Sequence, residues 1–328
     1  MEKCLVTKLA GAVTDNNNLL RLGEMRIKVG KVSDPTSVSQ CFGINVTQDT
    51  KLEIIGDGYF TDSSLAEDKG KELTITSFSS PSRQTKVYYS NSDIEIAVLG
   101  KYDISNFQLG KEFSGNLSFD VENLKYSKSL VYIDGIKSQI YGDIVNFKDL
   151  TNLSALSLDY TQVYGDIANI SKLTNLNILK LRNTQVYGDI SNFANLTNIY
   201  SFGLEYTKVH GDISVFKNFT NLLQVSFKGV SDIFGDPGTL PDNILFFSSN
   251  KGAFTWNTSS RTYILAMEKV KCDKIDALLN DMATKTAKFG GEESWWKTIS
   301  LIGTRTSASD AAVQTLQSKG YTVSITPA

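Results

Sequence analysis

The sequence predicts a solenoid of the α/β type with a parallel β-sheet on its concave face, preceded by an all-β region and followed by a βαβαβ cap. Three features predict it: a Gly-Asp motif that returns every 23 residues, an apolar pattern in phase with that motif, and two flanks without the repeat. We place an N-terminal β region for attachment or capping at 1–110, the solenoid at 111–260 and the C-terminal cap at 261–328.

An aromatic residue or histidine followed by Gly-Asp marks each repeat. The motif recurs in steps of 23 residues, and of 24 before the last copy, at Tyr141, Tyr164, Tyr187, His210 and Phe234. Between the copies runs a second pattern, seen as Leu150-Thr-Asn-Leu153-x-x-Leu156-x-Leu158. The Leu-x-Leu pair has the period of a β-strand, so both side chains point to one side. A single coil cannot cover that side, and stacked coils therefore bury a continuous core.

Two further positions recur in each coil. We expect Thr161, Thr184 and Thr207 to hydrogen-bond the turning backbone between neighbouring coils. We expect the motif glycines to lie where the chain bends tightly, because glycine bends without a Cβ penalty.

These residues resemble the leucine-rich repeat (LRR) family, with Thr in place of its usual Asn. The Val-Tyr-Gly-Asp-Ile segment is similar to the L-x-G-x-I segment of the plant-type subclass. The resemblance covers about residues 115–250 and implies a curved solenoid with its parallel sheet on the concave side. A looser copy between Leu130 and Ile140 is expected to form the terminal repeat.

Short stretches of alternating apolar and polar residues predict strands in the N-terminal region. They lie at 25–29, 51–55, 72–76, 86–89 and 93–98, and turn residues separate them. We therefore expect a small β domain, either independent or packed as a cap on the first repeat.

The C-terminal region alternates predicted strands and helices. The strands lie at 262–267, 297–302 and 321–325, and the helices at 273–289 and 307–316. Asp273 is the expected N-cap of the first helix, and Ser307 with Asp310 forms a variant capping box for the second. Gly320 is expected to end that helix. Parallel pairing through crossovers would let these strands continue the solenoid sheet and close its end.

The composition excludes several function classes. Lys and Arg number 33 against 35 Asp and Glu, and at a net charge of −2 we expect no nucleic-acid partner. No run of about 18 apolar residues occurs, so no membrane span is expected. With His210 as the single histidine and three scattered cysteines, the sequence predicts neither a zinc site nor histidine-based catalysis. We expect no enzymatic activity and no cofactor.

The solenoid turns each repeat position into a column of side chains. The motif aspartates either hold calcium or cap the short turn after each of them, and the lack of mixed oxygen ligands favours caps. The aromatic column forms either sugar-binding platforms or a stacked spine, and favourable ring packing at this spacing favours the spine. His210 then has a structural place in that column and no catalytic role.

Repeat folds usually bind their partners through the concave columns, because the side chains there do not pack in the core. We predict a partner-binding face of mixed charge and several tyrosines, made of Tyr132, Asp134, Lys137, Asp159, Tyr160, Lys180, Arg182, Glu205, Tyr206 and Lys228. This composition suits a protein or a surface glycan as the partner. An ordinary solvated face is the alternative. No catalytic or metal-binding residue is predicted.

The terminal segments carry a second resemblance, to LRR proteins of gut bacteria and their tailed phages. It rests on Cys4-Leu-Val-Thr-Lys-Leu-x-Gly11 and on residues 297–306 and 319–323. Lys8 also interrupts the first apolar stretch before it becomes a signal-peptide core. The resemblance implies a virion accessory or fibre protein on the virion surface, with the N-terminal region docked on other virion proteins. The alternative is a bacterial intracellular LRR protein of the cytoplasm that binds a protein partner. The oligomeric state is left open.

Overall fold

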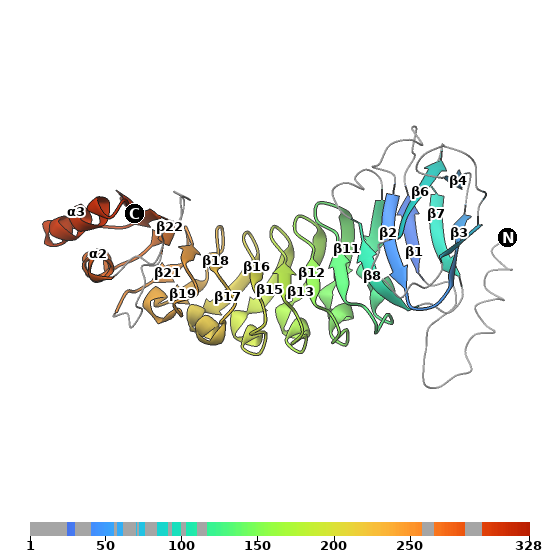
Figure 1. The fold of residues 1–328 in the computed structure, drawn as a ribbon, viewed down its shortest axis with the longest axis horizontal. Helices are drawn as coiled ribbons and strands as arrows, with labels where there is room; N and C mark the ends of the chain where they lie inside the picture. The colour runs from blue at the N-terminus through green and yellow to red at the C-terminus, as the bar shows by residue number, and fades with distance from the viewer. Residues whose placement is uncertain are drawn as a thin grey trace. The chain divides into compact units, whose positions relative to one another are not determined.

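The computed structural model describes residues 25–29, 41–55, 58–61, 70, 72–75, 84–90, 94–99, 103–109, 117–257, 266–285 and 297–328 (Figure 1). The chain divides into two compact units, Met1–Tyr164 and Gly165–Ala328. The division of the sequence at residues 110 and 260 stays a prediction.

Successive coils of the second unit share one arrangement, in which a short strand is followed by a long strand and a 3-10 helix (Figure 1). The short strands are β14 (Ile178–Lys180), β16 (Ser201–Gly203) and β18 (Gln224–Ser226). The long strands are β15 (Gln185–Asp189), β17 (Lys208–Asp212) and β19 (Ile233–Gly235). The 3-10 helices are η5 (Ile167–Ile170), η6 (Ile190–Phe193), η7 (Ile213–Asn218) and η8 (Pro237–Thr239).

Two parallel ladders run through these coils. In the first, β14 pairs with β16 so that Ile178 faces Ser201, one full repeat away. In the second, β15 pairs with β17 so that Tyr187 faces Lys208, two residues short of a full repeat. The predicted parallel sheet is confirmed. The second ladder was not predicted, because the Val-Tyr-Gly-Asp segment was assigned only to a bend.

The apolar positions of the two patterns fill the space between the ladders. Residues such as Leu179, Val186 and Ile190 are fully buried. Five phenylalanine side chains pack together in this core: the Phe216 ring lies 5.1 Å from that of Phe219 and 5.3 Å from that of Phe202, and Phe193 and Phe227 also contact Phe202. Such centroid distances are typical of attractive aromatic pairs. Each coil therefore takes its stability from the coils beside it.

The threonine ladder differs from the prediction. Oγ1 of Thr184 donates a 2.7 Å hydrogen bond to the carbonyl of Leu181, within the same coil. The link between coils comes instead from the Asn of the Leu-Thr-Asn-Leu pattern, since Nδ2 of Asn198 donates to the carbonyl of Thr174 at 3.0 Å. Thr184 lies three residues after the carbonyl it bonds, a spacing typical of a local turn. The prediction that the threonines join neighbouring coils was wrong.

In the first unit, eight described strands precede the coils. They are β1 (Arg26–Val29), β2 (Cys41–Val46), β3 (Thr50–Ile55), β4 (Gly58–Thr61), β5 (Glu72–Ile75), β6 (Gln84–Ser90), β7 (Ile94–Leu99) and β8 (Ile104–Gln108). The coils of this unit add β9 (Leu117–Asp120), β10 (Tyr132–Asp134), β11 (Gln139–Asp143), β12 (Ala155–Ser157) and β13 (Gln162–Asp166). The five strands predicted from alternating residues are confirmed as β1, β3, β5, β6 and β7. Sequence analysis missed β2, β4 and β8.

Backbone hydrogen bonds join the N-terminal strands of the first unit to its coils. The two sheets have the orders β13-β11-β9-β1-β7-β3-β5 and β12-β10-β8-β2-β6-β4. In one, β9 pairs antiparallel with β1 and parallel with β11; in the other, β8 pairs antiparallel with β2 and parallel with β10. Each antiparallel sheet thus continues one of the two parallel ladders. The region is a cap on the first coils, and this excludes the alternative of an independent domain.

The C-terminal strands form a parallel sheet with β18, the last short strand of the coils. They are β20 (Phe246–Ser248), β22 (Ala266–Lys271), β23 (Thr298–Ile302) and β24 (Thr322–Thr326), while β21 (Ala253–Phe254) pairs with β19. The order β18-β20-β22-β23-β24 is parallel throughout, so the C-terminal strands continue from β18, the last short strand of the coils, in a sheet separate from the one that ends at β16. The helices are α2 (Ile275–Thr284) and α3 (Asp310–Ser318). Among the described residues, no helix is both long and apolar enough to cross a bilayer.

The helix caps predicted at Asp273 and at Ser307 with Asp310 are not formed in the structure. Asp273 does not cap α2, because its Oδ2 accepts a hydrogen bond from Oγ1 of Thr255 at 2.9 Å. A 3-10 turn at Ser307–Ser309 precedes α3, and the side chain of Thr306 caps it by accepting from the amide of Ala308. The extra turn moves the cap one residue upstream of Ser307. Gly320 follows α3 at a φ of 86°, as predicted.

Candidate functional site

We call the outward side chains on and just after the short strands of the second unit the short-strand face. Its members are Lys180, Arg182, Asn183, Ser201, Glu205, Tyr206, Gln224, Ser226 and Lys228. Five of the ten predicted partner-binding residues lie on it. The other five lie in the first unit.

An ion pair lies on the short-strand face. Nε of Arg182 lies 2.8 Å from Oε2 of Glu205 in the next coil. The Arg182 side chain extends over Gly203, where a Cβ would come within 2.5 Å of Nε. Glycine in β16 thus gives the guanidinium room to reach across the strand. The ion pair fixes the positions of both charged side chains in the absence of a partner.

Tyr206 is the most exposed aromatic side chain of the described residues, at 56%. Its backbone has a φ of 57°, a left-handed conformation that costs a bulky residue about 1 kcal/mol or more. The equivalent residue of each neighbouring coil also has positive φ, at 54° for Asn183 and 78° for Gly229. The Tyr206 ring lies against Gly229, in the space that a Cβ there would occupy. The ring is therefore held in place and presented to solvent.

Two lysines complete this part of the face. Nζ of Lys228 lies 2.9 Å from Oε2 of Glu268, and both side chains are about one-third exposed. Lys180 is half-buried and makes no ion pair among the described residues. The face therefore presents both signs of charge, with most of the charged groups already paired.

The five predicted partner-binding residues of the first unit differ in their exposure and in their contacts. The Tyr132 hydroxyl donates to Oδ2 of Asp134 at 3.0 Å, and Nζ of Lys137 lies 5.4 Å from the centre of the Tyr160 ring. Asp159 is only 4% exposed, so the prediction that it is available at the surface was wrong. Its coil carries small outward residues, Ala155 and Ser157, which are also buried, and Ala155 lies beside the large Tyr132 in the sheet.

Sequence analysis missed two exposed residues at the other edge of the short-strand face. Tyr200 and Leu223 are 53% and 50% exposed, and each lies just before a short strand. They occupy the same position of consecutive repeats. The two preceding coils have the small or polar residues Ser154 and Asn177 at this position. The change to a large residue there is the sequence signal that could have revealed Tyr200 and Leu223.

The second outward surface follows the long strands and carries the aromatic column, and we call it the long-strand face. Tyr187, His210 and Phe234 are all exposed there, and no ring contact joins them. The two-residue offset of this ladder pairs Asp189 with His210 and Asp212 with Phe234. Successive rings are therefore displaced diagonally, by about 8 Å for strands 4.8 Å apart. The predicted stacked spine was wrong, because each ring lies beside an aspartate and not beside the next ring.

The motif aspartates are helix caps, as predicted. Oδ1 of Asp189 accepts from the amide of Ser191, and Oδ1 of Asp212 accepts from that of Ser214, each at 2.8 Å. The Asp189 carboxylate also lies over Gly211 of the next coil, where a Cβ would be 2.6 Å from Oδ1. The Gly-Asp motif thus joins consecutive coils. No group of three or more His, Cys, Asp or Glu that could hold a metal occurs in the described part of the chain.

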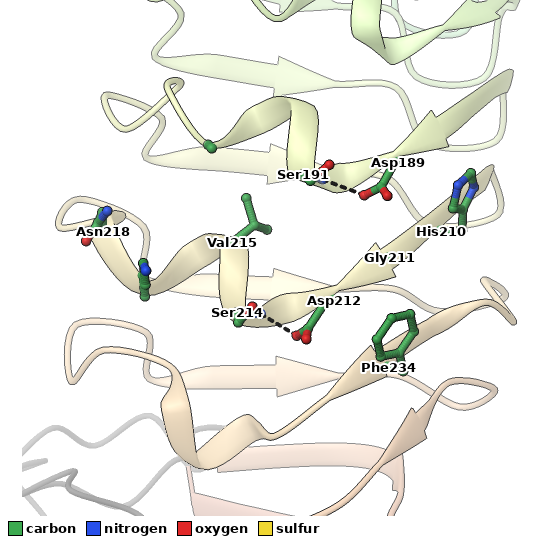
Figure 2. Close-up of a pocket in the computed structure, with 11 residues that line it drawn as sticks. Asp189, Ser191, His210, Gly211, Asp212, Ser214, Val215, Asn218 and Phe234 are labelled. Carbon is green, nitrogen blue, oxygen red and sulfur yellow. Dashed lines mark hydrogen bonds between the residues drawn. The ribbon is translucent and has the colours of Figure 1, made fainter.

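Between two coils the long-strand face is hollowed into a groove of about 400 Å³. Figure 2 shows His210 and Phe234 at one end of it and Asn218 at the other, with both capped aspartates between them. Ser191, Ser214, Val215 and Lys217 also line it. The groove brings aromatic, carboxylate, amide and hydroxyl groups together.

The coil geometry decides the type of repeat. In the coils the Leu-x-x-Leu-x-Leu residues point inward, the short strand β14 pairs in parallel with β16 one repeat on, and the Gly-Asp segment forms a second strand. The repeating unit is a leucine-rich repeat. The LRR pattern read from the sequence is thereby confirmed as the fold.

Neither a family model nor a curated protein matches the chain in sequence. Several solved structures are similar to part of the chain. The structure of PEPR1–AtPEP1 is 13% identical, with a TM-score of 0.49 over 69% of this chain and 35% of that one. The LRR ectodomain of GASSHO1/SCHENGEN3 from Arabidopsis thaliana is 17% identical, with a TM-score of 0.42 over 64% and 26%. A plant ice-binding protein is 19% identical, with a TM-score of 0.42 over 52% and 58%. The chain thus spans about a third of the PEPR1 structure.

Proposed function

We propose that this LRR protein is a non-enzymatic recognition protein whose short-strand face binds a protein partner. The observation that carries the proposal is Tyr206, a half-exposed ring on a left-handed backbone. Its own coil supplies Glu205 of the Arg182–Glu205 pair, and the next coil supplies Lys228 of the Lys228–Glu268 pair. The left-handed backbone recurs at this position in the neighbouring coils, so it belongs to the turn of the repeat and sets the direction of the side chain. Asn183 and Gly229 carry no ring there, so Tyr206 alone of the three places an aromatic side chain in solvent.

The chemistry of the face suits a protein interface. Tyrosine and arginine are the residues that most often carry binding energy, and a pre-positioned ring loses little entropy when it is buried. The paired charges of the face can meet a partner of mixed charge without leaving an ion unpaired. Tyr200 and Leu223 add apolar area at the opposite edge. Together these groups provide an apolar, partly charged surface on one ladder.

The replacement Tyr206→Asn tests the proposal. Asparagine tolerates the left-handed conformation and stands at this position in the preceding coil as Asn183, so stability should change by about 0.5 kcal/mol or less. Partner affinity should fall at least about tenfold, as for loss of a central tyrosine. A photo-crosslinking phenylalanine analogue at position 206 identifies the partner, and titration calorimetry of both forms then measures the affinity.

Tyr187 provides the matched control, because it is similarly exposed but lies on the other ladder. The photo-crosslinker at 187 should not label the same partner, and Tyr187→Asn should leave its affinity unchanged. Equal labelling from both positions, or full affinity in Tyr206→Asn, would contradict the assignment to the short-strand face.

For the biological setting we propose the virion surface, with a cytoplasmic location in a bacterium as the alternative. The proposal is supported by the terminal segments that resemble LRR proteins of tailed phages, and by the antiparallel cap as a base for attachment to other virion proteins. Electron microscopy of purified particles with an antibody to residues 115–250 should show label on the particle. Absence of the protein from purified virions would exclude this setting, and neighbouring capsid and tail genes would support it.

A further inference from the structure

We propose that the groove on the long-strand face binds a neutral glycan. The groove lies on the long-strand face, whereas the proposed protein-binding residues lie on the short-strand face. Glycan binding is therefore a second function, separate from protein recognition. The residues that carry the proposal are Asp189 with His210 and Asp212 with Phe234, two pairs set side by side by the two-residue offset of the ladder (Figure 2).

The Phe234 ring is free to contact a ligand. It is 48% exposed and makes no ring contact with another described residue, whereas the rings of Phe216 and Phe202 are buried in the core. Strand neighbours on a sheet lie about 4.8 Å apart, so the ring stands within reach of a ligand that also touches Asp212. An exposed aromatic face can pack against the C–H face of a sugar ring, as aromatic side chains combine an apolar face with polar neighbours at binding sites.

The carboxylates can accept hydrogen bonds from sugar hydroxyls. In both Asp189 and Asp212 the cap uses Oδ1, and Oδ2 has no hydrogen-bond partner among the described residues. Because the amide of the following turn fixes the carboxylate, its second oxygen already points in a set direction. A charged acceptor held in this way makes a stronger hydrogen bond than a neutral one.

The remaining lining favours a neutral ligand over a cation. Carboxylates beside aromatic rings also suit ammonium groups, but Lys217 lies in the same groove and would repel them. Lys217, Asn218 and the two serines supply donors as well as acceptors. A mixture of donors and acceptors around an aromatic ring fits a ligand that carries many hydroxyl groups and no charge.

The dimensions agree with this class of ligand. A volume of about 400 Å³ lies within the range of about 300–1,000 Å³ that is usual for small-ligand sites. Residues of η6 in one coil and of η7 in the next line the groove. The groove lies between these two helices and opens to solvent at the surface. An end or a branch of a longer glycan can therefore enter it.

The test applies the full chain to an array of bacterial and animal glycans and then measures the best neutral binder by titration calorimetry. Phe234→Ala and Asp212→Asn should each weaken binding at least about tenfold, through loss of the ring and of the charged acceptor. Asparagine keeps the cap, since it is as good an N-cap as aspartate. Circular dichroism and the thermal midpoint should be unchanged in both variants.

Tyr187→Ala is the matched control, because Tyr187 has the same repeat position and exposure as Phe234 but lies outside the groove. Its affinity should stay within about twofold of the original chain. The proposal is overturned if no neutral glycan binds, if Phe234→Ala binds as well as the original, or if tetramethylammonium competes for the site. Loss of glycan binding in Tyr206→Asn would place the site on the short-strand face and overturn it as well.

Discussion

Replacement of Phe216 by alanine should lower the free energy of unfolding by about 3–5 kcal/mol. The side chain is completely buried, and its ring lies 5.1 Å from Phe219, 5.3 Å from Phe202 and 6.0 Å from Phe227. These rings come from two consecutive coils, so truncation leaves a cavity between coils that no single coil can fill by moving. The loss combines the transfer of the ring from water with the unfilled volume.

Urea unfolding followed by circular dichroism measures this change. Phe234→Ala is the control, because it removes the same side chain from an exposed position and should change stability by about 0.5 kcal/mol or less. A loss below about 1 kcal/mol for Phe216→Ala would mean that the coils repack around the gap.

Replacement of Gly211 by alanine should destabilise the protein by about 2–4 kcal/mol, the sum of backbone strain and a steric clash. The φ of Gly211 is 128°, which side chains rarely permit. A Cβ would also lie 2.6 Å from Oδ1 of Asp189 and 3.0 Å from Cγ1 of Ile190. The cap of one coil would then have to move away from the next coil.

Gly320→Ala separates the two contributions. Gly320 also has positive φ, at 86°, but its nearest neighbours to a Cβ lie 3.6 Å away or more. Its alanine variant should lose only about 1 kcal/mol, from strain alone. Equal losses in the two variants, measured by the same urea titration, would show that contact with Asp189 contributes nothing.

The features that sequence analysis predicted correctly depend on local spacing. Leu179 and Leu181 are buried because a strand places alternate residues on one side, and any coil with this pattern must do the same. Asp212 caps η7 because its partner amide is only two residues away. Gly320 ends α3 for a similarly local reason.

The features that it missed depend on residues far apart in the chain. Asn198 and Thr184 are both polar residues of the repeat, and only the stacking of coils shows that Asn198 makes the link between them. Strand β8 was missed because its residues alternate weakly, with Ile104 and Phe107 as its buried apolar residues. It becomes a strand by pairing with β2 on one side and β10 on the other.

The candidate sites show the same division. Tyr206 could be placed on the short-strand face from its position in the repeat, but its left-handed backbone and its contact with Gly229 could not. Asp159 is buried together with Ala155 and Ser157 of its own coil, although its repeat position is the same as that of the exposed-face residues Arg182 and Glu205. The glycan groove depends on which aspartate lies beside which ring.

By itself, the sequence determined that the chain forms leucine-rich coils of 23 residues, with inward leucines, capped turns and strands at both ends. The tertiary structure decided that each coil contributes to two parallel ladders and that the second ladder is offset by two residues. The reason is physical: the repeat length sets how residues recur along the chain, whereas the pairing of backbone hydrogen bonds sets which residues become neighbours. That offset separates His210 from the other rings of the column and places it beside Asp189 in a groove.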